Sequence, residues 1–292
     1  MSDTGHDPLF TEQRPQLIRL AYRMLGSVAD AEDVVQDAYM RWLDVKREAV
    51  SEPKAYLRTI VARLCLNVLK SARRKRETYI GPWLPEPVFD PEDEDIADDI
   101  TLPLMMALER LSPLERTAFL LHDIFAVGYG EIADTLGREE AACRKLASRA
   151  REHIHAARQR FAVDRKEGRR LAEAFFQASR TGDLDALREL LREDATAYSD
   201  GGGKVAASLR PIVGIDDVMR RFAQLAILFR KQPSRLVRYA SIDGLPGFVT
   251  VEGGDILQTT ALQIEEGAVS AVFVLRNPDK LISLQRSLAQ QT

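Results

Sequence analysis

The sequence predicts a multidomain protein in which two all-α helical domains, the second containing a helix-turn-helix, precede an α+β domain. Apolar residues recur with helical period through most of the first 160 residues. Gly137 separates two short amphipathic segments, and segments rich in β-forming residues gather after Arg235. A chain of 292 residues is long enough for two or three domains with separate cores. We expect helical domains at 1–76 and 102–160, a linker at 77–101 and an α+β domain at 165–292.

Charge is unevenly distributed along the chain, although the net charge is only −3. Residues 138–170 hold eleven Lys or Arg against five Asp or Glu, whereas residues 77–101 hold nine acids and no base. The basic segment favours contact with nucleic acid, and the acidic one is typical of a solvated tether.

Cysteine usage and the termini indicate a reducing compartment. Cys65 and Cys143 both lie in amphipathic helical patterns, which favours buried free thiols over a disulfide or a metal site. The first ten residues lack the layout of a signal peptide, and nowhere do about 18 apolar residues run together. We therefore expect a cytoplasmic protein with no cofactor and no membrane contact.

Three helices are predicted in the first domain, over residues 13–25, 29–45 and 53–76. Gly26 ends the first, Asp30 is the expected cap of the second, and Pro53 suits the first position of the third. Polar residues Arg63, Asn67, Lys70 and Arg74 recur along one face of the third helix, which ends in RRKR. These groups could contact phosphates and bases, or the terminal cations could simply complement the helix dipole.

The linker has two unlike halves. Three prolines hold the first half, TYIGPWLPEP, in an extended conformation, so that Trp83 and Leu84 are presented as an apolar pair. We expect this pair to dock on another surface, with packing against its own domain as the alternative. The second half, VFDPEDEDIADDI, is acidic and is expected to be a flexible tether.

The second helical domain is predicted from a capping box and a helix-turn-helix. After a helix at 102–110, Ser112 and Glu115 have the spacing of a capping box around Pro113, opening a helix to Phe125. Two helices then flank Gly137, and the second has Ala142, Leu146 and Ala150 on its inner side. Its outward residues are Arg144, Lys145, Ser148, Arg149 and Arg151. Such a helix suits the DNA major groove, although a helical hairpin with a solvated basic face has the same pattern.

The third domain begins with two amphipathic helices, near 171–178 and 184–191. Strands are expected over residues 235–242, 247–251, 255–264 and 269–275, in an antiparallel sheet. The loop DGGGK, residues 200–204, lacks the arrangement of a nucleotide-binding loop and is interpreted as a plain loop or a contact loop. Asn277 is the expected cap of a last helix.

These motifs together resemble an extracytoplasmic-function (ECF) sigma factor of bacterial RNA polymerase over roughly the first 160 residues. DAEDVVQDAYMRW resembles the helix that binds the polymerase clamp, and LSPLER, YGEIADTLG and ACRKLASRAR resemble the domain that reads the minus-35 element. WLPEP, DGGGK and NPDKL resemble motifs of the subgroup with a SnoaL-like C-terminal domain, a curved α+β cone. The chain departs from many such domains by having Arg138, Glu139 and Glu140 where the recognition helix often starts with Ser or Thr.

The resemblance implies a role for each set of residues. The clamp would be contacted by Asp33, Gln36 and Asp37. The minus-ten element would be contacted by Arg63, Asn67, Lys70, Arg73 and Arg74, and the minus-35 duplex by Arg144, Lys145, Ser148, Arg149 and Arg151. Regulatory contacts between the linker and the C-terminal domain would be made by Trp83, Leu84, Pro85, Glu86, Pro87, Asp200, Gly201, Gly202, Gly203, Lys204, Asn277, Pro278, Asp279 and Lys280.

The resemblance also implies the partners, which are the clamp and flap of core RNA polymerase and promoter DNA. The C-terminal domain would control promoter binding in place of a separate anti-sigma protein, with a small ligand in the cone as a further option. Two other readings compete. An enzymatic C-terminal domain is disfavoured because all four histidines lie outside residues 165–292. A one-component ligand-sensing regulator would leave residues 29–76 without a purpose.

Overall fold

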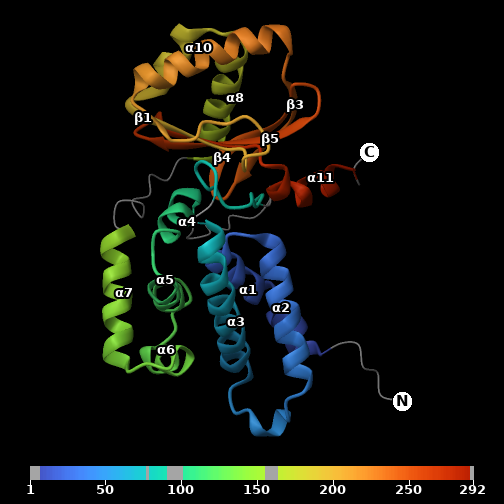
Figure 1. The fold of residues 1–292 in the computed structure, drawn as a ribbon, viewed down its shortest axis with the longest axis vertical. Helices are drawn as coiled ribbons and strands as arrows, with labels where there is room; N and C mark the ends of the chain where they lie inside the picture. The colour runs from blue at the N-terminus through green and yellow to red at the C-terminus, as the bar shows by residue number, and fades with distance from the viewer. Residues whose placement is uncertain (1–6, 77–78, 91–100, 155–163, 290–292) are drawn as a thin grey trace. The chain divides into compact units, whose positions relative to one another are not determined.

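The computed structural model describes residues 7–76, 79–90, 101–154 and 164–289, without the side chains of 49 and 72–76. It divides into two compact units (Figure 1). The first contains Met1–Thr78 and Ala107–Arg158, and the second contains Tyr79–Met106 and Gln159–Thr292. The residues that follow the first helical domain in the sequence therefore fold with the C-terminal domain. No described helix is long and apolar enough to cross a membrane.

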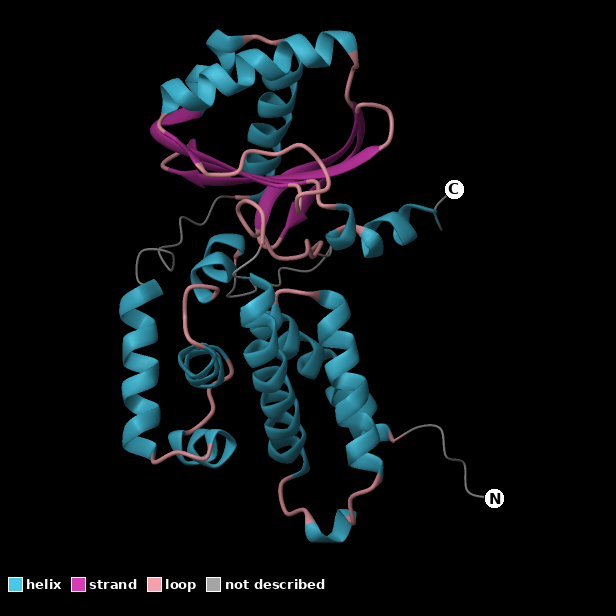
Figure 2. Cartoon of the chain, in the orientation of Figure 1, coloured by secondary structure: helices cyan, strands magenta, loops and turns pink. Residues whose placement is uncertain are grey.

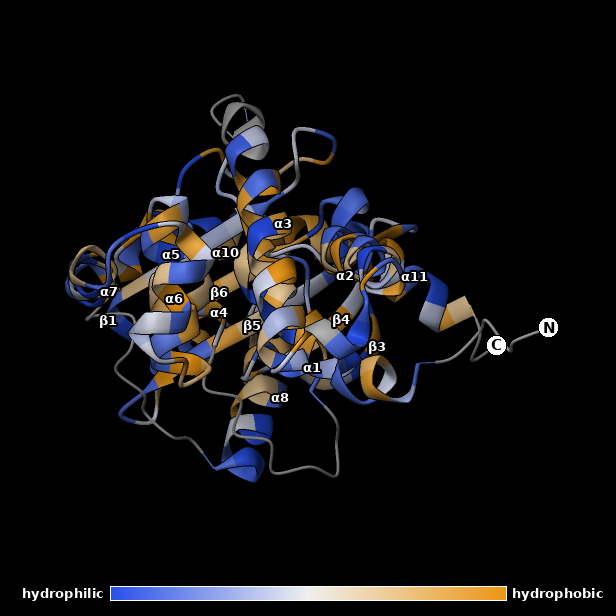
Figure 3. Ribbon diagram, turned by 90° about the horizontal axis from the view of Figure 1, so that it is seen from below, coloured by the Kyte–Doolittle hydropathy of each residue, from blue (hydrophilic) through white to orange (hydrophobic). Residues whose placement is uncertain are grey.

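The first unit opens with three helices, α1 (Pro8–Leu25), α2 (Val28–Leu43) and α3 (Pro53–Arg76), with a 3-10 turn η1 (Arg47–Ala49). Helix α1 begins earlier than predicted because the Asp7 carboxylate accepts a hydrogen bond from the Leu9 amide at 3.0 Å. The expected cap of α2 was wrong as well, since the hydroxyl of Ser27 accepts from the Asp30 amide at 3.2 Å. The ribbons of α2 and α3 alternate between hydrophilic and hydrophobic residues, as amphipathic helices do (Figure 3).

The later described part of this unit contains α5 (Pro113–Phe119), the π-helical turn η2 (Leu120–Ile124), α6 (Tyr129–Leu136) and α7 (Glu140–Ile154). The predicted capping box is confirmed, with Ser112 N to Glu115 Oε2 at 3.0 Å and Glu115 N to Ser112 Oγ at 3.3 Å. The α-helix stops at Phe119, short of the predicted end, because the backbone widens into η2. Gly137 adopts φ +61° between α6 and α7, as the helix-turn-helix prediction requires.

Helix α7 packs through a stripe that shares only Ala150 with the predicted one. Ala142 and Leu146 are only half-buried, and the buried positions are Cys143, Ala147, Ala150 and Ile154. Small residues at this spacing let α7 approach α5 closely. Both cysteines are free and buried, as predicted.

The second unit contains a six-stranded sheet with the order β2-β1-β6-β5-β4-β3. The sheet is the curved magenta layer in Figure 2. Its strands are β1 (Leu191–Asp200), β2 (Ile212–Val213), β3 (Arg235–Ile242), β4 (Leu245–Glu252), β5 (Ile256–Glu265) and β6 (Ala268–Leu275). The expectation of a purely antiparallel sheet is wrong, because β1 and β6 pair in parallel. The α+β class is confirmed.

Three helices cover one face of the sheet (Figure 2): α8 (Arg165–Thr181), α9 (Leu184–Leu190) and α10 (Ile215–Lys231). Phe175 of α8 and Phe222 of α10 meet edge to face, with ring centroids 5.5 Å apart, above Phe248 of β4. β1, β2 and α10 lie outside the predicted elements, although α10 buries Ile215 and Val218 at helical spacing.

The opposite face of the sheet is covered partly by the linker. Leu84 is 1% exposed and packs in one core with the first residue of α4 (Leu102–Leu108), Val249 and Phe273. The turn η4 (Pro278–Lys280) and α11 (Ile282–Ala289) follow β6 and add Leu284 to this core. Docking of Leu84 on another surface, as predicted, is therefore observed, and the acidic residues 91–100 lie outside the described residues.

Candidate functional site

Three predicted contact residues lie together on the solvent face of α2. Asp33, Gln36 and Asp37 are exposed, whereas Val34, Val35 and Ala38 are buried between α2 and its neighbours. The core residues fix the rotation of the helix, so that two carboxylates and an amide face outward in adjacent turns. This surface can accept hydrogen bonds and pair with cationic groups of a partner.

The polar face of α3 is already engaged in part by α6. Arg63 donates from Nε to the Thr135 carbonyl at 3.1 Å and from Nη2 to the Asp134 carbonyl at 2.6 Å. These carbonyls belong to the last turn of α6, where unsatisfied acceptors attract a cation. Asn67 and Lys70 are exposed. The side chains of Arg73 and Arg74 lie outside the described residues.

A second contact strengthens this α3–α6 pairing. Arg58 forms a bidentate ion pair with Glu131, with Nη2 at 2.6 Å from Oε1 and 2.9 Å from Oε2. The side chains are 24% and 31% exposed, so the pair is partly shielded from solvent. Neither residue was predicted, because an ion pair between separate helices leaves no local pattern in the sequence.

Helix α7 presents most of its predicted residues to solvent. Arg144, Lys145, Ser148 and Arg149 are exposed. Arg151 is the exception, since its Nε donates to Asp123 Oδ1 at 2.7 Å and its Nη2 to the Tyr129 hydroxyl at 3.1 Å. These hydrogen bonds raise the pKa of Arg151 above its ordinary value. Arg151 therefore ties α7 to η2 and α6.

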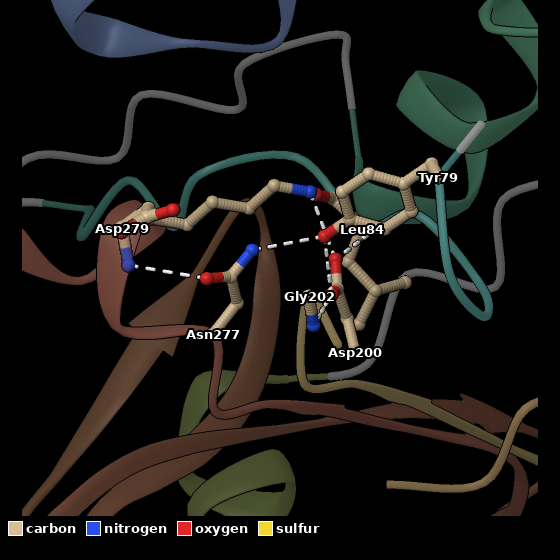
Figure 4. Close-up of polar contacts among 7 residues, drawn as sticks. Tyr79, Leu84, Asp200, Gly202, Asn277 and Asp279 are labelled. Atoms are coloured by element: carbon tan, nitrogen blue, oxygen red, sulfur yellow. Dashed lines mark hydrogen bonds and ion pairs between the residues drawn. The ribbon is translucent and has the colours of Figure 1, made fainter. Parts of the chain in front are cut away.

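The carboxylate of Asp200 forms the centre of a network between the linker and the C-terminal domain (Figure 4). Its Oδ1 accepts from the Tyr79 hydroxyl at 2.6 Å and from the Gly202 amide at 3.0 Å. Its Oδ2 accepts from the Leu84 amide at 2.9 Å and from Lys280 Nζ at 2.8 Å. The Asp200 side chain is fully buried, so these four donors replace its hydration. We call these five residues, together with Asn277, the Asp200 network.

Lys280 connects Asp200 of β1 to the linker. Its ammonium donates to the Leu84 carbonyl at 2.6 Å, pairs with Asp200, and lies 4.2 Å above the Trp83 ring centroid. Asn277 donates from Nδ2 to the Tyr79 hydroxyl at 2.9 Å and caps η4 through the Asp279 amide at 3.1 Å. Burial, and then the hydrogen bond to Asp200, raise the pKa of Tyr79, so the phenol remains a donor.

The topology of the sheet explains why distant motifs meet here. β1 and β6 run in parallel, with Asp200 opposite Leu275, so the loops that follow them leave the same edge of the sheet. DGGGK follows β1 and NPDKL follows β6, and the backbone of Arg276 donates to the Asp200 carbonyl at 2.9 Å. A Cβ on Gly202 would lie 2.3 Å from Asn277 Nδ2, which leaves no room for a side chain between the loops.

The remaining residues of the three motifs lie around this network. Pro85 is buried, and Glu86, Pro87 and Pro278 are half-buried. Lys204 and Asp279 are exposed and pair with each other at 2.6 Å. Gly201 leaves no space for a Cβ beside the Val205 carbonyl, and a Cβ on Gly203 would displace the exposed side chain of Ile80. Tyr79 was not predicted, although an aromatic residue next to WLPEP was a signal that could have indicated it.

Among the residues that the structure describes, no group of three or more His, Cys, Asp or Glu side chains could hold a metal ion. The polar groups described above are arranged for binding.

Comparison with known proteins agrees with this architecture. Residues 9–75 match the model of Sigma-70 region 2, and residues 101–154 match that of Sigma-70, region 4. Two such regions in this order define a sigma factor of the Sigma-70 class. SigJ, an ECF RNA polymerase sigma factor of Mycobacterium tuberculosis, is 39% identical over 97% of this chain and 96% of its own length. SigI of the same species, a probable ECF RNA polymerase sigma factor, is 33% identical over 97% of this chain and 98% of its own.

The crystal structure of SigJ extends the likeness to three dimensions. It superposes with a TM-score of 0.74 at 36% identity, covering 94% of this chain and 97% of SigJ. The chain therefore belongs to the ECF RNA polymerase sigma factors. It takes part in promoter-specific initiation of transcription with core RNA polymerase and promoter DNA as partners, and sigma factors are not enzymes.

Proposed function

We propose that the C-terminal domain regulates initiation from within the chain by holding linker residues 79–90 through the Asp200 network. The observation that carries this proposal is the buried Asp200 carboxylate, two of whose donors, Tyr79 and Leu84, belong to the linker. The docked segment also pairs with the end of β3, where the Asp243 amide donates to the Val88 carbonyl at 2.8 Å. In this proposal no separate anti-sigma protein is required.

Because the linker is attached near both of its ends, the distance that it can span is limited. Tyr79 is bound near its start, and after its end the Leu102 amide donates to the Asp243 carbonyl at 3.0 Å. Fully extended, residues 77–101 would span at most roughly 85 Å. Two DNA-binding regions joined by a free linker can engage separate promoter elements, whereas a docked linker restricts their separation. Release of the linker is therefore expected to increase initiation.

We also propose which surfaces contact the partners. The exposed acids and amide of α2, Asp33, Gln36 and Asp37, would bind the polymerase clamp. Arg63, Asn67, Lys70, Arg73 and Arg74 would contact the minus-ten element, where cationic and amide groups can bind unstacked bases and phosphates. Arg144, Lys145, Ser148 and Arg149 would grip the minus-35 duplex, and Arg151 would support them by anchoring α7. Arg63 is exposed but hydrogen-bonded to the last turn of α6, so this scheme requires those two bonds to be exchanged for contacts with DNA as α3 and α6 separate.

The regulatory proposal is tested with Lys280→Met in the full-length chain. Loss of the ammonium leaves the Asp200 carboxylate buried without a cation, and breaking such a pair costs about 3 to 5 kcal/mol. Hydrogen exchange of the Leu84 amide is expected to accelerate at least about tenfold. Initiation from a host promoter by core polymerase supplied with the variant is expected to rise severalfold. Lys231→Met is the matched control, because Lys231 is exposed at the end of α10 and belongs to none of the three motifs.

Hydrogen exchange of Leu84 and initiation of transcription test different parts of the regulatory proposal. Faster exchange at Leu84 with unchanged initiation would refute regulation through the linker. Unchanged exchange would show that the Asp200 network does not hold the linker. Neither result would affect the sigma-factor assignment. That assignment is tested separately with the double variant Asp33→Ala and Asp37→Ala, which is expected to lose binding to core RNA polymerase.

A further inference from the structure

A cavity of about 260 Å³ lies in the C-terminal domain between the sheet and α10, on the face opposite the docked linker. Its apolar wall includes Phe175, Phe222, Leu225 and Phe229. Drug-sized ligands occupy pockets of about 300 to 1,000 Å³, so this cavity suits a smaller molecule. The cavity plays no part in the contacts proposed above for polymerase, DNA or linker.

Charged side chains are concentrated at this apolar cavity. Arg180, Arg221 and Arg276 line it, against a single acid, Glu252. Glu252 is 4% exposed and already has three donors, Arg180 Nη2 at 2.8 Å, Thr250 Oγ1 at 2.8 Å and the Ser234 hydroxyl. Arg180 therefore neutralises Glu252, and Arg221 and Arg276 give the cavity an excess of two positive charges.

Two guanidinium donors at the cavity lack a partner. The Nε atoms of Arg180 and Arg276 are buried and make no hydrogen bond to any residue that the structure describes. Arg276 is held in place by Nη1, which donates to the Ala206 carbonyl at 3.0 Å. A buried donor without an acceptor costs free energy, and natural proteins rarely leave one.

The electrostatics favour an added negative charge. Burial lowers the pKa of Arg276, and the neighbouring Arg221 and Arg180 lower it further, while Glu252 acts in the opposite direction. An anion beside these guanidinium groups would offset their mutual repulsion and accept from the unpaired Nε–H. The apolar wall excludes a fully hydrated ion, so the anion must carry an apolar body.

We propose that the cavity binds a small amphipathic carboxylate, with its head group on Arg276 and Arg221 and its aliphatic or aromatic body against Phe222 and Phe229. Arg180 holds Glu252 away from the head group, so that the acid does not compete for the same cations. Gln258 and Thr260, on the floor of the cavity, bond to each other at 3.3 Å and form its neutral end.

Isothermal titration calorimetry of the full-length chain tests the site with octanoate and 1-octanol, which share one apolar chain and differ in charge. Octanoate is expected to bind at least about tenfold more tightly than the alcohol, which corresponds to one charge-assisted hydrogen bond or more. Arg276→Gln and Arg221→Gln are each expected to weaken octanoate about tenfold. Arg220→Gln is the matched control, because Arg220 precedes Arg221 on α10 but is exposed and paired with Asp217.

Several results would overturn the proposal. Equal affinity for octanoate and 1-octanol would show a cavity without anion recognition, and this comparison needs only the wild-type chain. Octanoate binding that survives Arg221→Gln combined with Arg276→Gln would place the anion elsewhere. No heat of binding at millimolar octanoate, measured at two temperatures because apolar burial can release no heat near room temperature, would exclude the assigned class of ligand. Because no polymerase is involved, these outcomes are separate from those of the regulatory proposal.

Discussion

Gly202 lies where the loops after β1 and β6 touch, with φ +61°. In Gly202→Ala the new Cβ would lie 2.3 Å from Asn277 Nδ2, so the Asp200 network must shift. We expect the C-terminal unit to lose about 2 to 4 kcal/mol of unfolding free energy, from backbone strain and the clash together. Gly267→Ala is the control, since Gly267 has φ +81° but open space around a Cβ. Urea unfolding should show a smaller loss for the control, and equal losses would contradict the clash.

Individual residues of the network were predictable to different degrees. Asp200, Lys280 and Leu84 were predicted because they lie in short motifs that resemble those of a known family. Their chemistry, a buried carboxylate with four donors, depends on tertiary contacts between residues more than 75 positions apart, such as Lys280 and Asp200. Composition and spacing do not specify such pairings, so the bond from Tyr79 to Asp200 was missed even though the position of Tyr79 near WLPEP was a signal.

Asp7 joins three elements of the first unit through one carboxylate. It caps α1, accepts from Trp42 Nε1 at 2.5 Å and pairs with Arg47 at 2.8 Å. Burial alone would raise the pKa of Asp7, but these hydrogen bonds and Arg47 outweigh it, so the pKa lies below its ordinary value of 3.8. A depressed pKa means that the ionised carboxylate stabilises the fold above about pH 3.8 and that this stabilisation is lost as the pH falls through the folded-state pKa.

Asp7→Asn keeps a capping oxygen but removes the charge. We expect it to lower the unfolding free energy by about 1 to 2 kcal/mol at pH 7, and the difference from wild type to shrink as the pH falls from about 5 to 3. Urea unfolding followed by tryptophan fluorescence measures this, because Trp42 is a direct partner. Asp44→Asn, at an exposed aspartate that follows α2, should change stability by less than about 0.5 kcal/mol. A difference that does not depend on pH would contradict an electrostatic role.

Two neighbouring arginines of α7 should have different roles, one in DNA binding and the other in the stability of the fold. Arg149→Ala removes an exposed cation, so we expect weaker binding to the minus-35 duplex and a shallower salt dependence, with unchanged stability. Arg151→Ala leaves Asp123, which is 9% exposed, without its ion pair, so we expect about 1 to 2 kcal/mol of lost stability. Duplex titrations at several salt concentrations, together with thermal unfolding, distinguish the two. A reversed pattern would assign the phosphate contact to Arg151.

Secondary structure was predictable where one face of an element is buried and the other is polar. Strand β3 spans its predicted residues, and β4, β5 and β6 differ by one or two residues at their ends. β1 has mostly partly exposed and polar positions, so its sequence lacks the alternation that indicates a strand. Because β1 was missed, its parallel pairing with β6 could not be predicted, and this pairing brings the DGGGK and NPDKL loops together.

In the first unit the α3–α6 contact is one of those that join the two helical regions, beside the bond from Arg116 Nη1 to the Met24 carbonyl at 2.8 Å. Arg58 and Glu131 form a bidentate pair, and Arg63 binds the end of α6. If core polymerase binds only the open form, its apparent affinity is reduced by the fraction of chains that are closed. Glu131→Gln removes the charge from the pair and should increase the open fraction, so we expect tighter binding to core polymerase, by about threefold to tenfold.

The appropriate measurement is a titration of core polymerase with full-length variants. Glu12→Gln is the matched control, because it makes the same charge change in an exposed ion pair with Lys54 and should leave the affinity unchanged. Arg58→Gln should act in the same direction as Glu131→Gln, and the double variant should add little, since both substitutions remove one interaction. Additive gains, or an affinity equal to wild type, would mean that polymerase binds without opening α3 from α6, and Arg63 would then need a role other than contact with the minus-ten element.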